Sequence, residues 1–194
     1  MLIAFEGLDQ SGKETQARYL RTRLEQDGRK VYALSFPDYE TPIGREVAAA
    51  LRGERDFNAA VMQLLYVANR MEFKPRIDAW LEAGSSIVCD RYRASSVAYG
   101  EAMGLDGAWL REIQRFLPEP TLTVLLDIAP ETAVARKSTG RDKFERDLGL
   151  LARVRESYRR QAAAEDWVLI DGEQSKDAVT AAVAAAVLPR LARR

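Results

Sequence analysis

The residues that most clearly indicate a binding site, by their types and by their spacing, are those of the loop from Gly7 to Gly12 and Lys13, which follows the loop. In Gly-x-x-x-x-Gly-Lys loops the glycines allow backbone N–H groups to converge on phosphate oxygens, and the lysine reaches the β and γ phosphates. The start of the following helix adds partial positive charge. A nucleoside triphosphate is therefore the first ligand to consider. The residues expected to bind it are Gly7, Leu8, Asp9, Gln10, Ser11, Gly12, Lys13, Glu14 and Thr15.

Glu14 departs from the usual motif, in which Ser or Thr offers a hydroxyl to magnesium at this position. Thr15 stands one residue later. The Glu14 carboxylate either binds magnesium or points to solvent. Solvent is favoured, because a magnesium ion that keeps several waters and contacts phosphate needs few protein ligands.

An acid and an arginine, Asp90 and Arg91, follow the apolar run 86–89 at the carboxyl end of a predicted central strand. Ligands of open α/β sheets bind at this edge. A carboxylate there can hold magnesium-bound water, and an arginine can grip a phosphoryl group with two hydrogen bonds. A functional role is therefore favoured over the alternative, a salt-bridged strand end.

Asp9 lies inside the phosphate loop. A carboxylate there is unfavourable beside a triphosphate unless it serves a cation or an acceptor hydroxyl. The alternative is an Asx turn that stabilises the loop. Asp9 and Asp90 are thus the candidate magnesium ligands, directly or through water. The candidate catalytic residues at this edge are Lys13, Asp9 and Arg91.

The segment 136–160 is locally basic, with nine Lys and Arg residues against four Asp and Glu residues. The stretch 138–140 interrupts the helical pattern between Arg136 and Arg141. These features predict a short basic lid at about 136–147 that closes over phosphates and excludes water. The alternative is a solvated helical face.

Composition limits the class of protein. The chain has 194 residues, 47% of them hydrophobic, which is enough for one buried core, so a single domain over 1–194 is expected. Lys and Arg total 29 and Asp and Glu total 29, so the chain lacks the basic excess of proteins that bind nucleic acid polymers or anionic membranes. A small ligand is therefore expected.

Histidine is absent and the chain has one cysteine, Cys89, which excludes an internal disulfide, a histidine metal site and a histidine general base. Cys89 lies in an apolar run, where a small buried side chain is favoured over a reactive thiol. The sequence shows neither a basic leader before the first strand nor an apolar stretch of membrane-spanning length. A cytoplasmic location is expected.

Strand-like apolar runs alternate with segments of helical period, which is typical of a parallel sheet covered by helices on both faces. The expected strands are 2–6, 31–36, 86–90, 121–128 and 167–170. The expected helices are 13–27, 42–52, 58–82, 93–102, 106–117, 130–137, 148–164 and 175–192. Thr41 and Asn58 are expected to cap helices, and Pro75 is expected to kink the longest one. The predicted fold class is α/β, a three-layer P-loop NTPase fold with a five-stranded parallel sheet flanked by helices.

Five groups of residues, spread along the chain, match sequence motifs of a known family. They are Phe5-Glu6-Gly7-Leu8-Asp9 with Gly12-Lys13, Phe36-Pro37, Leu65-Tyr66-Val67-Ala68-Asn69-Arg70, Asp90-Arg91-Tyr92 with Ala94-Ser95-Ser96-Val97-Ala98-Tyr99, and Asp142-Lys143-Phe144-Glu145. Together they resemble the thymidylate kinase family of P-loop nucleoside monophosphate kinases, over essentially the whole chain. The resemblance implies phosphorylation of dTMP to dTDP, with ATP as phosphoryl donor and Mg²⁺ as cofactor.

The resemblance also implies roles for single residues. Tyr66 would stack on the thymine ring, Arg70 would contact the base, and Ser96 would hydrogen-bond its polar edge. Tyr99 would crowd the sugar 2′ position, and Arg91 would hold the acceptor phosphate. The implied dTMP-binding residues are Asp9, Phe36, Pro37, Tyr39, Tyr66, Arg70, Arg91, Ser96 and Tyr99.

Members of the family differ in whether the phosphate loop or the lid carries the catalytic arginine. The loop of this chain has Gln10. The resemblance therefore implies that Arg136 and Arg141 of the lid are catalytic and neutralise charge on the transferring phosphoryl group. It also implies a homodimer that forms through the helices near 58–82 and 93–117.

Four positions depart from the family's usual residues: Tyr66 replaces Phe, Asn69 replaces Asp, Phe73 replaces His, and Gly100 replaces a polar residue. Gly100 removes a possible base contact, and these changes bear on fine acceptor specificity, not on the reaction class. A kinase for another pyrimidine nucleotide or for a deoxynucleoside is one alternative. A nucleotide-binding regulatory protein is another, although such a switch does not require a second nucleotide pocket.

Overall fold

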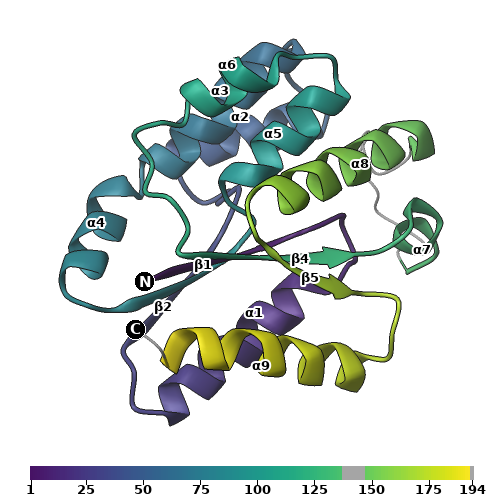
Figure 1. Cartoon of the computed structure of the whole chain (residues 1–194). Helices are drawn as coiled ribbons and strands as arrows, with labels where there is room; N and C mark the ends of the chain where they lie inside the picture. The colour runs from purple at the N-terminus through teal and green to yellow at the C-terminus, as the bar shows by residue number, and fades with distance from the viewer. Residues whose placement is uncertain (137–146, 193–194) are drawn as a thin grey trace.

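The strands of the protein form one parallel sheet in the order β2-β3-β1-β4-β5 (Figure 1). The structure is a computed structural model and describes residues 1–136 and 147–192. The strands are β1 Leu2–Glu6, β2 Val31–Ser35, β3 Ser86–Asp90, β4 Leu122–Asp127 and β5 Val168–Asp171. The expected five-stranded parallel sheet is therefore confirmed, with strand ends within one residue of their predicted positions.

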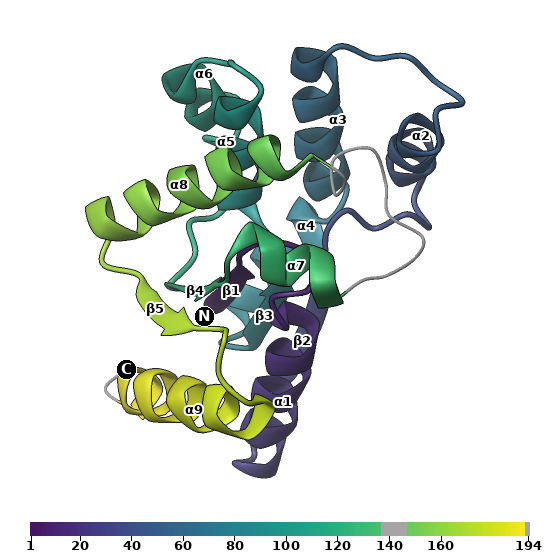
Figure 2. The ribbon, with the colours of Figure 1, turned by 90° about the vertical axis from the view of Figure 1, so that its right-hand side faces the viewer.

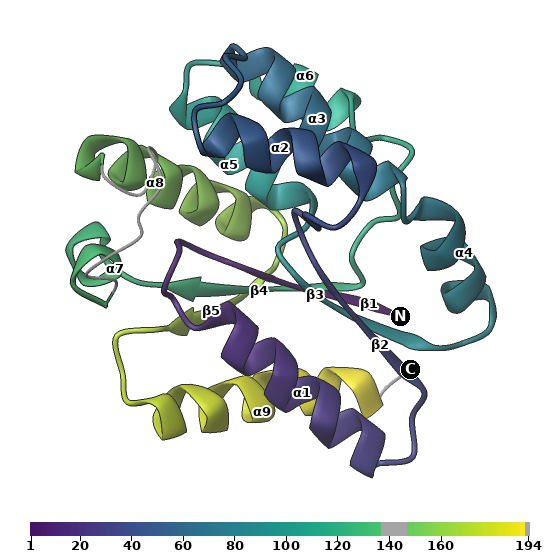
Figure 3. The same ribbon diagram turned by 180° about the vertical axis from the view of Figure 1, so that it is seen from behind.

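Helices cover both faces of this sheet (Figures 1 and 3). One face carries α1 (Lys13–Gln26) and α9 (Lys176–Ala192). The helices of the opposite side are α2 Pro42–Leu51, α3 Ala59–Met71, α4 Lys74–Glu82, α5 Arg93–Ala102, α6 Gly107–Glu112, α7 Pro130–Arg136 and α8 Leu148–Ala164. The three-layer α/β architecture is confirmed.

The central strand β1 shows why the strands are continuously apolar. Its side chains alternate between the faces, so Ile3 and Phe5 pack with α1 and α9, whereas Leu2 and Ala4 pack with the opposite helices. Every residue of β1 is buried. Since both faces of a parallel sheet are covered, such a strand has no polar face.

The expected long helix over 58–82 is wrong, because the chain forms two helices there. α3 ends at Met71 and α4 begins at Lys74, with Pro75 in its first turn. Proline has no N–H to donate back along a continuing helix, but the first turn of a new helix does not need one. The expected cap of α3 is confirmed, since Asn58 Oδ1 accepts a hydrogen bond from the Val61 N–H at 2.9 Å.

Strand register brings distant segments to one edge of the sheet. Phe5 of β1 and Ser35 of β2 both pair with Asp90 of β3, so the loops after all three strands begin side by side. Figure 2 faces this carboxyl edge, with the start of α1 below it and α3 and α8 above. The candidate residues Asp90 and Arg91 therefore lie at the carboxyl ends of the strands, as the sequence predicts.

Candidate active site

The loop between β1 and α1 has a backbone that only glycine adopts without strain at its two ends. Gly7 has a φ of 138°, and a Cβ atom there would lie 2.4 Å from the Leu126 carbonyl oxygen. Gly12 has a φ of 95° and is the N-cap of α1. The two glycines therefore allow the chain to turn from strand into helix, as the phosphate-loop motif requires.

Lys13 is buried at the first position of α1, and its Nζ donates a 2.7 Å hydrogen bond to the Leu8 carbonyl oxygen. Burial and the nearby Arg91 guanidinium lower the pKa of Lys13 to about 8, while Asp9 and Asp90 oppose this shift. A phosphate group in the loop would supply negative charge beside the ammonium group and raise its pKa again.

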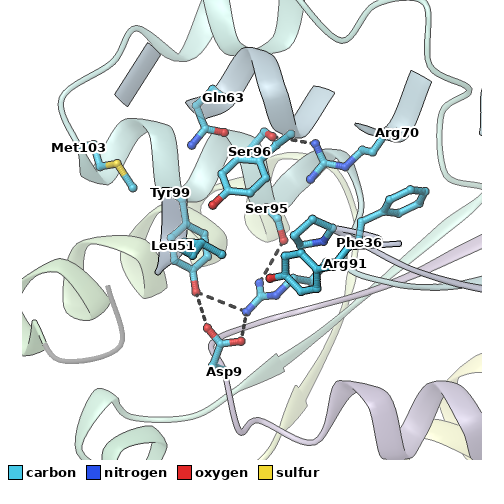
Figure 4. Close-up of a pocket in the computed structure, with 13 residues that line it drawn as sticks. Asp9, Phe36, Leu51, Gln63, Arg70, Arg91, Ser95, Ser96, Tyr99 and Met103 are labelled. Carbon is cyan, nitrogen blue, oxygen red and sulfur yellow. Dashed lines mark hydrogen bonds and ion pairs between the residues drawn. The ribbon is translucent and has the colours of Figure 1, made fainter. Parts of the chain in front are cut away.

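Arg91 and Asp9 form an ion pair at the carboxyl edge of the sheet (Figure 4). Arg91 Nη2 donates to Asp9 Oδ1 at 2.7 Å, and the Tyr99 hydroxyl donates to Asp9 Oδ2 at 3.2 Å. Burial alone would raise the pKa of Asp9, but Arg91 and Lys13 hold it well below its usual range. Burial alone would lower the pKa of Arg91, but Asp9 raises it. Both side chains therefore stay charged at neutral pH.

A buried network that the sequence analysis missed fixes the other side of Arg91. Glu6 is fully buried at the end of β1 and accepts hydrogen bonds from the Ser95 hydroxyl at 2.6 Å and the Tyr158 hydroxyl at 3.1 Å. Arg91 Nη1 donates to the same two hydroxyl oxygens, at 3.1 and 3.0 Å. The single charged residue in an apolar strand was the only signal for this network in the sequence.

Two cavities meet at this ion pair. The inner cavity has a volume of about 220 Å³ and lies between the sheet edge and α3 and α5. Its lining residues are Asp9, Phe36, Pro37, Tyr39, Leu51, Gln63, Tyr66, Arg70, Arg91, Ser95, Ser96, Tyr99 and Met103. All nine residues that the family resemblance implies for acceptor binding are in this set. Leu51, Gln63, Ser95 and Met103 were missed.

The second cavity, here called the loop cavity, has a volume of about 460 Å³. Its lining residues are Asp9, Gln10, Gly12, Lys13, Glu14, Thr15, Ser35, Phe36, Pro37, Tyr39, Asp90 and Arg91. Asp9 and Arg91 belong to both cavities. The two sites are therefore adjacent, with an anion and a cation between them.

Polar contacts inside the inner cavity come from α3 and α5. Arg70 is buried, and its Nη1 donates a 2.8 Å hydrogen bond to Ser96 Oγ. Burial lowers the pKa of Arg70, and Glu6 opposes that shift. Tyr66 lines the cavity one turn before Arg70 on the same helix. The cavity thus combines aromatic surface with fixed hydrogen-bond donors, as a site for a planar polar ring does.

Asp90 fits a magnesium ligand better than Asp9 does. Asp90 Oδ1 is buried and has no hydrogen-bond partner among residues 1–136 and 147–192. Asp9 already uses both oxygens on Arg91 and Tyr99. In the described part of the chain, no three acidic or cysteine side chains are placed so that they could together hold a metal ion. These residues therefore suit a cation that takes most of its ligands from water and phosphate.

Three of the four departures from the family pattern have structural explanations. Asn69 is buried and hydrogen-bonds the backbone of Asp38, at 2.8 Å to its N–H and 3.0 Å to its carbonyl oxygen. Phe73 packs in the hydrophobic core. A Cβ atom on Gly100 would lie 2.6 Å from the Leu110 side chain. Gly100 thus packs against α6 and is not among the residues that line the inner cavity, and the interpretation that it removes a base contact stays a prediction.

Of the two candidate lid arginines, Arg136 lies beside the phosphate loop. It is exposed at the end of α7 and donates to the Gln10 carbonyl oxygen at 3.2 Å and the Gly172 carbonyl oxygen at 2.9 Å. Arg141 and the rest of the expected lid from 137 to 146 lie outside the described residues.

Cys89 is fully buried in β3, and burial raises the pKa of its thiol well above the usual range. The prediction that this cysteine is buried is confirmed. The described chain contains no helix that is both long enough and apolar enough to cross a membrane.

Glu14 is exposed at the mouth of the loop cavity. Replacing Glu14 with alanine is expected to change kcat by less than about threefold, because an exposed carboxylate in high dielectric contributes little to charge stabilisation. Steady-state kinetics over a magnesium titration would test this. A loss of several hundredfold, recovered at high magnesium concentration, would instead make Glu14 a metal ligand.

The fold, the phosphate loop and the adjoining inner cavity define a kinase with the P-loop NTPase fold. A family model described as thymidylate kinase matches residues 5–183. The chain belongs to the thymidylate kinase family.

Proteins described as thymidylate kinases are similar to this chain over most of its length. It is 31% identical to thymidylate kinase from Dictyostelium discoideum over 93% of this chain and 81% of that protein. It is 36% identical to a probable thymidylate kinase from Pyrobaculum aerophilum over 94% of this chain and 93% of that protein. The solved structure of thymidylate kinase from Candida albicans superposes with a TM-score of 0.83 at 28% identity, covering 97% of this chain and 91% of that one.

Proposed function

We propose that the chain transfers the γ-phosphoryl group of ATP, bound in the loop cavity, to dTMP bound in the inner cavity, giving dTDP and ADP. The observation that carries this proposal is that Asp9 and Arg91 line both cavities. The phosphate of one nucleotide and the terminal phosphate of the other would therefore meet at the same point. Membership of the thymidylate kinase family supports both substrates.

On the donor side, the loop from Gly7 to Gly12 would hold the ATP phosphates with backbone N–H groups. Lys13 would neutralise charge on the β and γ phosphates. Asp90 is our candidate for holding Mg²⁺, through water or directly. When bound, this ion would neutralise the negative charge that develops on the donor phosphates.

On the acceptor side, Arg91 would place the dTMP phosphate in line with the γ phosphorus. An acceptor phosphate oxygen forms the new bond to that phosphorus, the bond to the β–γ bridging oxygen breaks, and ADP leaves with the electron pair. No general base is needed, since the acceptor oxygen is already anionic, which agrees with a chain without histidine. Positioning and charge neutralisation therefore account for most of the catalysis.

The remaining roles follow from the geometry of the inner cavity. Tyr66 would stack on the thymine ring, with Arg70 and Ser96 at its polar edge. Tyr99, held by its bond to Asp9, would stand beside the sugar. The other proposed acceptor contacts are Phe36, Pro37 and Tyr39, which close the cavity from the loop after β2.

We also propose one kinase domain over 1–194, with a lid at about 136–147 that delivers Arg136 and Arg141 to the transferring phosphoryl group. The contact of Arg136 with the loop carbonyl of Gln10 supports this placement. We further propose a cytoplasmic homodimer that acts on small nucleotides and binds neither nucleic acid polymers nor membranes. The balanced charge of the chain supports small ligands over nucleic acid polymers and membranes. Leu64, an exposed apolar side chain on α3, supports association through that helix.

A coupled assay for ADP release tests the function directly. The acceptors to compare are dTMP, dUMP, dCMP and thymidine, because the related Candida albicans enzyme is described as having broad substrate specificity. We expect dTMP to be turned over with the highest kcat/KM. Turnover of thymidine but not dTMP would indicate a nucleoside kinase, and dTMP binding without turnover would indicate a regulatory protein.

A further inference from the structure

Gln63 is a buried polar residue in the inner cavity that the proposed mechanism does not use. It lies on α3, one turn before Tyr66 and two turns before Arg70, so all three residues share one helix face. Its side chain is fully buried. Neither its amide nitrogen nor its amide oxygen has a hydrogen-bond partner among the residues that the structure describes.

An unpaired buried amide is unfavourable, and an apolar side chain of the same size would avoid this cost. Each of the other buried glutamines, Gln16, Gln114 and Gln161, makes at least one side-chain hydrogen bond. Gln161 Nε2 donates to Ser157 Oγ at 3.3 Å, and Gln114 Nε2 donates to the Leu110 carbonyl oxygen at 2.9 Å. Within the described chain the amide of Gln63 is therefore exceptional in having both of its polar atoms unpaired, and it lines a ligand cavity.

The position of Gln63 in the cavity indicates which part of a nucleotide it would meet. Figure 4 shows Asp9 and Arg91 at one end of the cavity and Gln63 near the other, with Ser96 and Arg70 close by. If the phosphate lies at Arg91, the base lies at the far end, because it is the part of a nucleotide most remote from the phosphate.

We propose that Gln63 is a specificity-determining residue that pairs with the polar edge of a pyrimidine-2,4-dione. Its Nε2 would donate to a ring carbonyl oxygen, and its Oε1 would accept from the ring N3–H. This assignment rests on the proposed function, since it places the acceptor base in the inner cavity. Both polar atoms of the amide lack a partner within the described chain before binding, so each new hydrogen bond would satisfy a buried group instead of replacing an existing bond within the protein.

Arg70 determines which pyrimidine ring this pairing favours. The Nε of Arg70 is also buried without a hydrogen-bond partner in the described chain, and a guanidinium can only donate. A ring carbonyl oxygen satisfies such a donor, whereas the exocyclic amino group of cytosine would face it with N–H groups. Gln63 alone could pair with either ring after rotating its amide, but Gln63 together with Arg70 favours the dione.

The test compares Gln63→Leu and Gln63→Met with the unmodified enzyme, using dTMP and dUMP as acceptors. Both acceptors carry the same dione edge and differ in the 5-methyl group. We expect each variant to raise KM by about 10- to 100-fold for both acceptors, by the same factor, with kcat changed by less than about twofold. The melting temperature should stay the same or rise, because the substitution removes an unpaired buried amide.

Gln161→Leu is the matched control, since Gln161 is buried, hydrogen-bonded and outside the inner cavity. This variant should lose about 2–4 °C in melting temperature and keep the KM for dTMP.

Two results would overturn the role of Gln63 while leaving the proposed function in place. One is an unchanged KM in both Gln63 variants, with a lower melting temperature. The other is a KM increase for dTMP only, which would make Gln63 a contact of the methyl group. If the unmodified enzyme neither bound nor phosphorylated dTMP, the proposed function itself would fail and the role of Gln63 with it.

Discussion

Replacing Arg91 with alanine is expected to lower kcat/KM for dTMP by about 10³-fold or more. The substitution removes a two-point grip on the acceptor phosphate. It also leaves the Asp9 carboxylate, now paired to Arg91 at 2.7 Å, facing that phosphate without its cation. Two like charges would then share the junction of the cavities, which opposes binding of the acceptor. Steady-state kinetics with dTMP as the varied substrate would measure the loss.

Arg91→Lys separates charge from geometry. Lysine keeps the positive charge but not the planar fork, and it cannot reproduce the bonds of Nη1 to the Ser95 and Tyr158 hydroxyls. We expect this variant to recover about a tenth of the lost activity or less.

The matched control for this prediction is Arg93→Ala, two residues along the chain. Arg93 pairs with Glu119 and donates to the Leu117 carbonyl oxygen, away from both cavities. Its loss should change kcat/KM by less than about twofold. Equal effects of the Arg91 and Arg93 substitutions would remove the assigned role of Arg91.

Replacing Lys13 with alanine is expected to lower kcat by about 10³-fold. The ammonium group is buried against the loop by its bond to the Leu8 carbonyl oxygen, so the negative charge of the transferring group meets it with little intervening water. Because charge on the leaving β–γ oxygen grows toward the transition state, the loss should appear mainly in kcat rather than in KM. A variant that loses only affinity for ATP would show that Lys13 acts in binding alone.

The pH dependence offers an independent test of Lys13. Its pKa is lowered to about 8, so in the free enzyme the cation is present below that pH and is lost above it. We therefore expect kcat/KM for ATP to fall above pH 8, by about tenfold per pH unit at the limit, since this parameter reports the free enzyme. Lys13→Arg keeps its charge throughout this range and should lack the decline. A profile that stays flat to about pH 10 in the unmodified enzyme would contradict the assignment.

How much of the site was predictable depended on whether its residues give a local signal in the sequence. The phosphate loop is a contiguous motif, and Asp90 and Arg91 directly follow an apolar run, so the sequence pattern alone places both at strand ends. The acceptor residues came instead from the family resemblance, and all of them line one cavity. Gln63 and Tyr158 lie inside ordinary helical patterns and give no local signal.

The sequence by itself determined the strands and most of the helices of this protein, because hydrophobic period, glycine position and helix caps act over a few residues. It therefore placed the strands, the phosphate loop and the edge where chemistry occurs. Only the tertiary structure decided which charges pair. Arg91 binds Asp9, 82 residues away, rather than its neighbour Asp90, and Glu6 meets Tyr158 across 152 residues.

The physical reason is that such pairings depend on strand register and helix packing. Two side chains meet only when the whole sheet fixes their separation, and a one-residue shift in register would turn a strand residue such as Glu6 to the opposite face. Burial likewise comes from packing, and burial left the Gln63 amide unpaired within the described chain and lowered the pKa of Lys13. The sequence gives the types of these residues, but the burial and the charged neighbours of Gln63 and Lys13 depend on how the chain folds.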